Sequence, residues 1–128
     1  MREVELSHGA KMPQIQLGTF RTRGPNVEIA VAAALEAGYR GIDTAAVYRN
    51  HADIADSLDK NLPRLGLARS DLFLTSKLAP KNHGGEKCRE AVKTALAELR
   101  TDYLDLFLLH WPGVQKLPVD HPDNRKLR

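Results

Sequence analysis

The sequence predicts an α/β protein in which parallel strands alternate with helices. Short, mostly apolar runs that suit buried strands are separated along the chain by longer segments whose apolar residues recur at helical spacing. The strand-like runs are residues 15–20, 39–44, 72–76 and 103–109. The last run is apolar almost without a break, as a strand of a parallel sheet covered on both faces must be. No Gly-x-Gly-x-x-Gly motif follows any of these runs, which disfavours a Rossmann sheet with the same order of elements.

An amino-terminal hairpin is expected to precede the first strand. Apolar and charged residues alternate before a turn at His8-Gly9, and an extended run resumes after it, so residues 3–15 predict a β-hairpin. Gly18 lies in the strand that follows, where a glycine lets the backbone approach a ligand closely.

Three segments have the apolar periodicity of amphipathic helices. The first lies between Pro25, which suits a first helical turn, and Gly38, which suits a helix end. The second follows Asn50, a residue type that caps helices, and is expected to stop at Pro63. The third has the clearest pattern, and its apolar residues are Cys88, Ala91, Val92, Ala95, Leu96 and Leu99.

Polar residues able to take part in acid chemistry stand at the ends of three strand-like runs. These residues are Asp43, Lys77 and His110, and Tyr48 lies in the loop after the first of them. Because the carboxyl ends of parallel strands share one face, we expect the four side chains to lie together. Each has a structural explanation when taken alone. Asp43 suits a turn cap, Tyr48 suits rim packing, and Lys77 and His110 suit satisfied residues at strand ends.

Composition excludes several classes of function. The chain has 128 residues, 27% of them charged and 42% hydrophobic, which suits one soluble domain with a real core. The formal charge of +3 comes from scattered basic residues, so nucleic-acid binding has no support. No apolar run approaches the length needed to cross a bilayer. The amino terminus lacks the apolar core of a secretory signal and Cys88 is the only cysteine, so we expect a cytoplasmic protein.

No metal site is expected. His51, His83, His121 and Cys88 have no spacing typical of metal ligands. We interpret them as surface or helix-face residues.

The motifs around the four polar residues resemble the aldo-keto reductases, in particular glyoxal and aldose reductases. The resemblance rests on GIDTAAVY, LFLTSKL and YLDLFLLHWP and extends from Met12 to Pro112. It implies a (β/α)₈ barrel, of which 128 residues form about half. We therefore expect a partial barrel in residues 1–112, with an amino-terminal hairpin, about four parallel strands and three helices. Residues 113–128, which lack periodicity, are expected to be an irregular loop or tail.

The resemblance implies that the protein reduces aldehydes or ketones to alcohols with NADPH. A tyrosine phenol has a pKa of about 10 in water, so it needs a nearby positive charge to act as an acid near neutrality. By resemblance, Tyr48 donates the proton, Lys77 supplies the charge, Asp43 holds Lys77, and His110 orients the substrate oxygen.

The resemblance also assigns residues to the cofactor and to the small-molecule carbonyl substrate. Those implied for the cofactor are Gly18, Thr19 and Asp43. Those implied for the substrate are Phe20, Val47, His110 and Trp111. Many family members have tryptophan in place of Phe20, a departure expected to change the shape of the pocket more than the mechanism. The substrate itself is not specified by these residues.

An alternative function belongs to a different class. In the family, the main contacts to the cofactor phosphates come from the carboxyl-terminal half of the barrel, so the cofactor site of an amino-terminal half is expected to be incomplete. The last strand would then leave an open edge. We therefore keep as the alternative a non-catalytic half-barrel module that pairs with itself or with a full-length relative.

Overall fold

The computed structural model describes residues 2–114, 116–118 and 120–125, and its centre is a four-stranded parallel sheet. The strands lie in the order β3 (Leu17–Gly18), β4 (Gly41–Asp43), β5 (Phe73–Leu78) and β6 (Leu106–Leu109). A separate antiparallel hairpin consists of β1 (Glu3–Glu5) and β2 (Lys11–Pro13). The helices are α1 (Pro25–Glu36), α2 (His51–Arg64) and α3 (Gly85–Leu99). None of the helices in the described residues is long and apolar enough to span a membrane.

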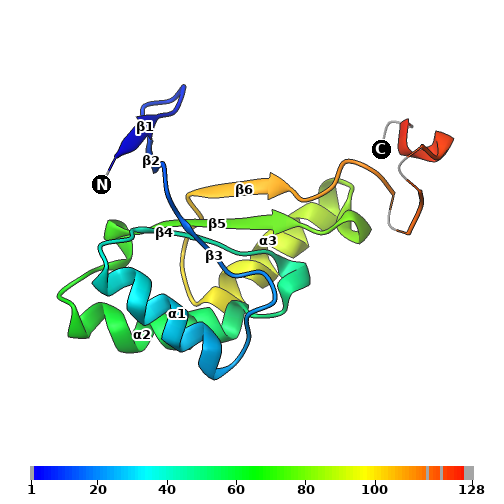
Figure 1. Ribbon diagram of the computed structural model, residues 1–128. Helices are drawn as coiled ribbons and strands as arrows, with labels where there is room; N and C mark the ends of the chain where they lie inside the picture. The colour runs from blue at the N-terminus through cyan, green and yellow to red at the C-terminus, as the bar shows by residue number, and fades with distance from the viewer. Residues whose placement is uncertain (1, 115, 119, 126–128) are drawn as a thin grey trace.

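The helices all lie on one side of the sheet, as Figure 1 shows. The hairpin lies near the amino ends of the strands, and the carboxyl-terminal segment leaves from their carboxyl ends. The predicted partial barrel is therefore confirmed: four parallel strands and three helices form an arc that does not close.

The register of the sheet aligns the carboxyl ends of its strands. Gly18 pairs with Asp43, Asp43 with Thr75, and Lys77 with Leu108. Since all four strands run in one direction, the loops that leave them gather at one edge, where ligands bind in parallel α/β folds.

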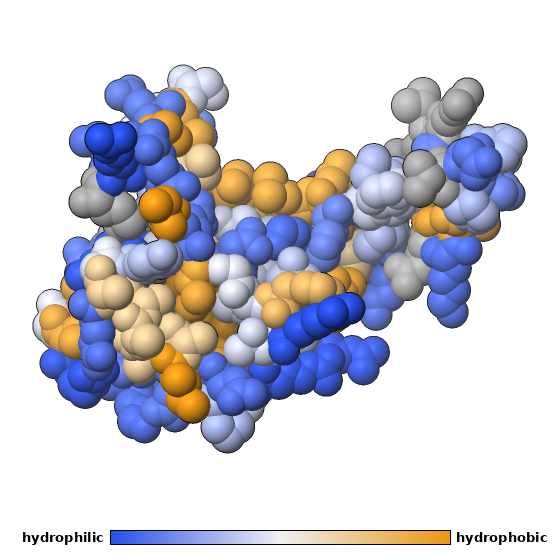
Figure 2. All heavy atoms as spheres, viewed as in Figure 1, coloured by the Kyte–Doolittle hydropathy of each residue, from blue (hydrophilic) through white to orange (hydrophobic). Residues whose placement is uncertain are grey.

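The core lies between the sheet and its helices. Apolar residues four apart on α1 and α2 face the sheet, as their periodicity predicts. The buried core residues are Val27, Val31, Leu35, Ile42, Ile54, Leu58, Leu72, Leu74 and Leu99. The last strand is less covered, because Leu108 and Leu109 are 40% and 65% exposed. Figure 2 shows apolar side chains gathered along this strand.

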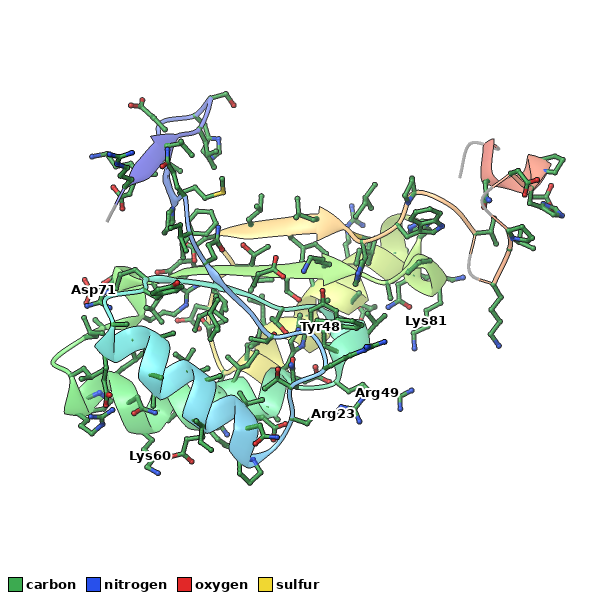
Figure 3. All side chains as sticks on the ribbon, in the orientation of Figure 1. Arg23, Tyr48, Arg49, Lys60, Asp71 and Lys81 are labelled. Atoms are coloured by element: carbon green, nitrogen blue, oxygen red, sulfur yellow. The ribbon has the colours of Figure 1, made fainter. Side chains whose placement is uncertain are left out.

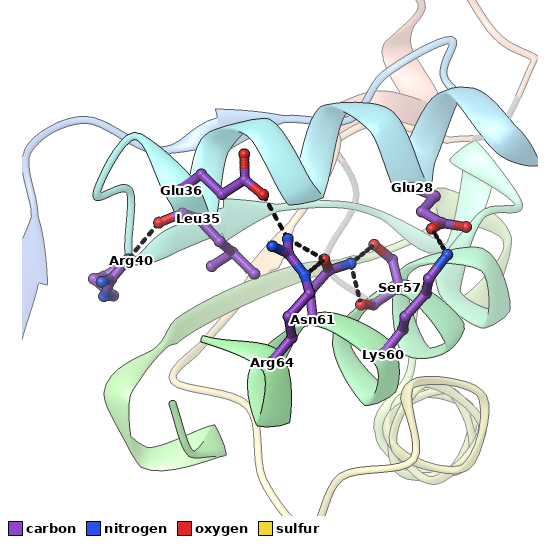
Figure 4. A network of polar contacts seen from close by, with 8 residues as sticks. All are labelled: Glu28, Leu35, Glu36, Arg40, Ser57, Lys60, Asn61 and Arg64. Carbon is purple, nitrogen blue, oxygen red and sulfur yellow. Dashed lines mark hydrogen bonds and ion pairs between the residues drawn. The ribbon is translucent and has the colours of Figure 1, made fainter. Parts of the chain in front are cut away.

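Polar contacts join α1 and α2 at the surface. Arg64 donates from Nη2 to Glu36 Oε1 at 2.6 Å and to Asn61 Oδ1 at 2.8 Å. Lys60, four residues before Arg64 in α2, forms an ion pair with Glu28 in the first turn of α1 (Figure 4). These contacts fasten the last turns of α2 to α1.

Several element boundaries differ from those expected. The last strand, expected over 103–109, begins only at Leu106. The first strand is two residues long instead of spanning 15–20, since it pairs only with β4 among the described residues. The second helix does not stop at Pro63 but continues to Arg64, whose side chain bonds the helix and α1. The start of this helix is as expected, with Asn50 at the N-cap position, although the Asn50 side chain makes no capping hydrogen bond.

The carboxyl-terminal segment contains one short 3₁₀ turn, Pro122–Arg125. The expectation of an irregular tail over 113–128 falls partly outside the described residues, because it includes residues 115, 119 and 126–128.

Candidate active site

Lys77 brings three of the predicted residues together. Its ammonium group lies 2.5 Å from Asp43 Oδ1, 2.9 Å from the carbonyl oxygen of Thr44, and 3.3 Å from the hydroxyl of Tyr48. The Lys77 side chain is 13% exposed, so this positive charge is largely shielded from water. Asp43 ends β4 and Lys77 lies near the end of β5, which explains why neighbouring strands deliver the pair to one place.

Tyr48 occupies the centre of the site. It ends a short 3₁₀ turn, Ala46–Tyr48, and Arg49 turns the chain away in a left-handed conformation with φ of 55°. Its ring lies 5.2 Å from the ring of Phe20 and meets the His110 ring edge-on at 5.7 Å, both measured between centroids. The phenol therefore has aromatic neighbours on two sides and a cation beside its oxygen.

His110 completes the predicted set. Its backbone N–H donates to the carbonyl oxygen of Leu78 at 3.1 Å, which extends the pairing of β6 with β5 by one residue. Burial, with a further contribution from the positive charge of Lys77, lowers the pKa of His110 below its ordinary value. Nδ1 is buried and has no hydrogen-bond partner in the described residues. A neutral imidazole has one N–H that can donate a hydrogen bond and one nitrogen that can accept one.

Asn50 holds the loops that surround these residues, a role that sequence reasoning missed. It is 1% exposed, and its Nδ2 donates to the carbonyl oxygens of Thr19 and Thr22, each at 2.9 Å. Its Oδ1 accepts from the hydroxyl of Thr44 at 2.7 Å. The only available signal was the position of an asparagine two residues after Tyr48, and that signal equally suits a helix cap.

The residues implied for the cofactor lie side by side at the ends of β3 and β4. Gly18 is exposed, and a Cβ added there would meet no atom within 4 Å, so the space beside it is open. Thr19 is buried, and its hydroxyl donates to the carbonyl oxygen of Asp43 at 2.9 Å. The Asp43 carboxylate is already engaged with Lys77.

The residues implied for the substrate divide into two groups. Val47, His110 and Trp111 line one open pocket. Phe20 is not part of that lining and packs against Tyr48 instead, with the two rings tilted by 53° and 61% of the Phe20 surface exposed. The other residues of the lining were missed from the sequence, and they are Pro80, Val114, Lys116 and Leu117.

Positive charge surrounds the site. The loops that leave the four parallel strands, residues 19–24, 44–50, 79–84 and 110–114, contain four cationic residues and no acidic one. We call Arg21, Arg23, Arg49 and Lys81 the cationic rim. Figure 3 shows Arg23, Arg49 and Lys81 reaching outward on the side of Tyr48. The Arg21 guanidinium lies 5.1 Å from the centroid of the Phe20 ring. Such an arrangement attracts anions.

Comparison with known proteins shows the family. The aldo/keto reductase family profile matches residues 14–118. Aldo-keto reductase family 1 member A1-A of Danio rerio is 42% identical over 126 residues, a match that covers 94% of this chain and 39% of the relative. D/L-glyceraldehyde reductase of Hypocrea jecorina is 44% identical over 112 residues, covering 87% and 34% of the two chains.

Solved structures show the same relationship. The aldose reductase of Schistosoma japonicum superposes with a TM-score of 0.86 at 42% identity and covers 94% of this chain and 40% of its own. An aldo/keto reductase of Brucella melitensis gives a TM-score of 0.80 at 40% identity, with 87% and 41% covered. The chain thus spans about two fifths of the length of the relatives that it matches. The family profile and the superposed structures agree with the sequence motifs and the strand order. The chain therefore belongs to the aldo/keto reductase family.

Proposed function

We propose that this chain supplies the proton-donating side of an active site that reduces an aldehyde or ketone to an alcohol with NADPH. The observation that carries the proposal is the ammonium group of Lys77, held by Asp43 at 2.5 Å and placed 3.3 Å from the Tyr48 hydroxyl. A family of oxidoreductases supports the reaction class. The choice of NADPH and of the proton donor is our inference.

Tyr48 is the proton donor in this scheme. Reduction adds a hydride to the carbonyl carbon and a proton to its oxygen, and NADPH when bound supplies the hydride. As the oxygen gains negative charge, Tyr48 transfers its phenolic proton to it, leaving a phenolate that solvent later protonates again. The Lys77 cation, 3.3 Å from the phenolic oxygen, stabilises the phenolate. Asp43 keeps that cation in place.

His110 orients the carbonyl. Its lowered pKa favours the neutral imidazole, which has one N–H to donate to the substrate oxygen. The edge-on packing against Tyr48, with 5.7 Å between centroids, brings this donor and the phenol to the same small region. A carbonyl oxygen between the two would be held for proton transfer.

The described residues fit the proposed cofactor on two observations. Open space lies beside Gly18, next to Asp43 in the sheet, where a ring can approach the backbone. The loops that carry the cationic rim contain no acidic residue of their own to repel phosphates, and the Asp53 carboxylate that contacts one of them accepts from the Gly24 backbone N–H at 2.9 Å. Gly18, Thr19 and Asp43 are the residues that we propose hold the nicotinamide end.

NADPH consumption with a generic reactive aldehyde tests the proposal. We expect only slow turnover by the folded chain, because its contacts to the cofactor phosphates are expected to be incomplete. We expect Tyr48→Phe to lower that rate about 100-fold or more, because general acid catalysis contributes at least that factor. Tyr103→Phe is the matched control, since Tyr103 is exposed and lies outside the site. A folded parent chain without turnover, or an undiminished Tyr48→Phe, would contradict the proposal. Circular dichroism checks the fold of each variant.

A second candidate function is a non-catalytic half-barrel module that pairs with a second copy of this chain or with a full-length relative. It is favoured by β6, which pairs only with β5 among the described strands and exposes 65% of Leu109. Unpaired strands of this kind invite pairing with another chain. Sedimentation should then show a discrete dimer that Leu109→Lys converts to monomer. A parent that stays monomeric when mixed with itself or with such a relative would remove this candidate.

A further inference from the structure

A second cluster of polar side chains lies behind the active site, and the proposed chemistry uses none of its members. His51, the first residue of α2, is 2% exposed. Its Nδ1 lies 2.8 Å from Glu98 Oε2, and its Nε2 lies 2.9 Å from Ser76 Oγ. Of the two expected placements, surface or helix face, His51 takes the helix face and is buried there. The three side chains come from α2, β5 and α3.

The protons of this cluster have one consistent arrangement for a neutral imidazole. A carboxylate only accepts hydrogen bonds, so the Nδ1–H donates to Glu98 and Nε2 accepts the hydroxyl hydrogen of Ser76. The order of serine, histidine and acid matches a nucleophilic triad. Ser76 is completely buried, however, so no substrate reaches its hydroxyl. The cluster must act through what it holds in place.

The cluster holds the backbone on both sides of the proposed catalytic pair. Ser76 directly precedes Lys77 in β5, and alternation along the strand points Ser76 toward the helices and Lys77 toward the site. His51 directly follows Asn50 in the sequence. The Asn50 side chain accepts a hydrogen bond from Thr44 and so fixes the loop that carries Tyr48. One imidazole therefore connects the strand of Lys77 to the loop of Tyr48.

We propose that His51 is a positioning residue for the pair formed by Lys77 and Tyr48. By joining Ser76 to the start of α2, it fixes the 3.3 Å separation between the ammonium and the phenolic oxygen. The inference rests on the proposed function for its catalytic meaning. The geometry itself can be tested without turnover, because a well-held Lys77 amine is protected from chemical labelling.

The test is acetylation of lysines in the native chain, measured site by site with mass spectrometry. We expect His51→Leu, which removes both hydrogen bonds, to raise the labelling rate of Lys77 roughly two- to tenfold, the factor that one ordinary hydrogen bond supplies. Ser76→Ala should reproduce most of this increase. His51→Gln, which retains a donor and an acceptor, should restore much of the protection. Lys60 and Lys93, whose side chains are 64% and 73% exposed, serve as internal references.

A matched control separates positioning from general stability. Arg100 also links α3 to α2, through Asp56 Oδ1 at 2.6 Å and Asp59 Oδ2 at 2.9 Å, and these contacts do not involve β5. Arg100→Met should leave the labelling of Lys77 unchanged. An equal rise in Arg100→Met, or no rise in His51→Leu, would overturn the proposal. Should His51→Leu not fold, the labelling of Lys77 in Ser76→Ala is compared with that in His51→Gln and Arg100→Met. A rise in Ser76→Ala alone supports the proposal, and no rise overturns it.

Turnover gives an independent second readout. If the parent chain reduces aldehydes, His51→Leu should lower kcat with little change in KM, and His51→Gln should recover part of the loss. If the parent shows no turnover, the proposed function fails while the labelling result stands alone, so the two failures are distinguishable.

Discussion

His110 is expected to make the folded chain sensitive to acid. Burial and the nearby Lys77 charge lower its pKa in the folded chain, so the unfolded chain binds this proton more tightly. The resulting penalty begins as the pH falls below about 6.5, the ordinary value for histidine, and grows until the lowered folded value is reached. At higher pH the residue imposes no such penalty. The free energy of unfolding should therefore fall with acid in this window.

Urea unfolding of His110→Gln across the same pH range measures this contribution. We expect the variant to lose part of the acid sensitivity of the parent chain. His8→Gln is the control, because His8 lies exposed in the turn of the amino-terminal hairpin. A variant whose stability depends on pH as steeply as that of the parent would show that His110 is not a source of the effect.

At the scale of elements, the sequence predicted what depends on periodicity and missed what depends on partners. The three helices follow from apolar residues that recur on one face, and this face is buried in α1 and α2 and partly buried in α3. The first strand was expected over residues 15–20 but spans two, because strand length depends on the neighbouring strand. The helix α2 continues one residue beyond Pro63, to Arg64, whose side chain bonds Glu36 of α1, a tertiary contact that no local rule contains.

The site shows the same division. Asp43, Lys77 and His110 were predictable because strand ends share one edge in any parallel sheet. The buried contacts of Asn50 and His51 were not predictable. A cap-forming asparagine looks the same in a sequence whether its side chain bonds its own helix or two distant loops. A histidine that starts a helix gives no sign that a serine and a glutamate from other elements will reach it.

At the scale of the whole molecule, charge is distributed unevenly. The formal charge is only +3, yet the four loops that leave the strands carry the cationic rim and no acidic residue. Most acidic residues of the three helices pair with cations outside these loops, as Glu86 does with Arg89 and Glu90 with Lys93. Asp53 of α2 instead accepts from the backbone N–H of Gly24 at 2.9 Å, in one of the loops. A small net charge therefore coexists with a strongly positive entrance to the site. Long-range attraction of an anionic cofactor depends on this local field.

Loss of one rim charge should weaken NADPH binding in a way that depends on salt. We expect Arg23→Gln or Arg49→Gln to raise the Kd roughly two- to fivefold at low ionic strength, since an exposed ion pair contributes up to about 1 kcal/mol. The difference should shrink at high ionic strength because salt screens exposed charges. Titration of NADPH fluorescence measures both effects. Lys60→Gln removes the same charge from α2, away from Tyr48 (Figure 3), and should leave the Kd unchanged. Equal weakening by all three variants would mean that net charge, and not the cationic rim, attracts the cofactor.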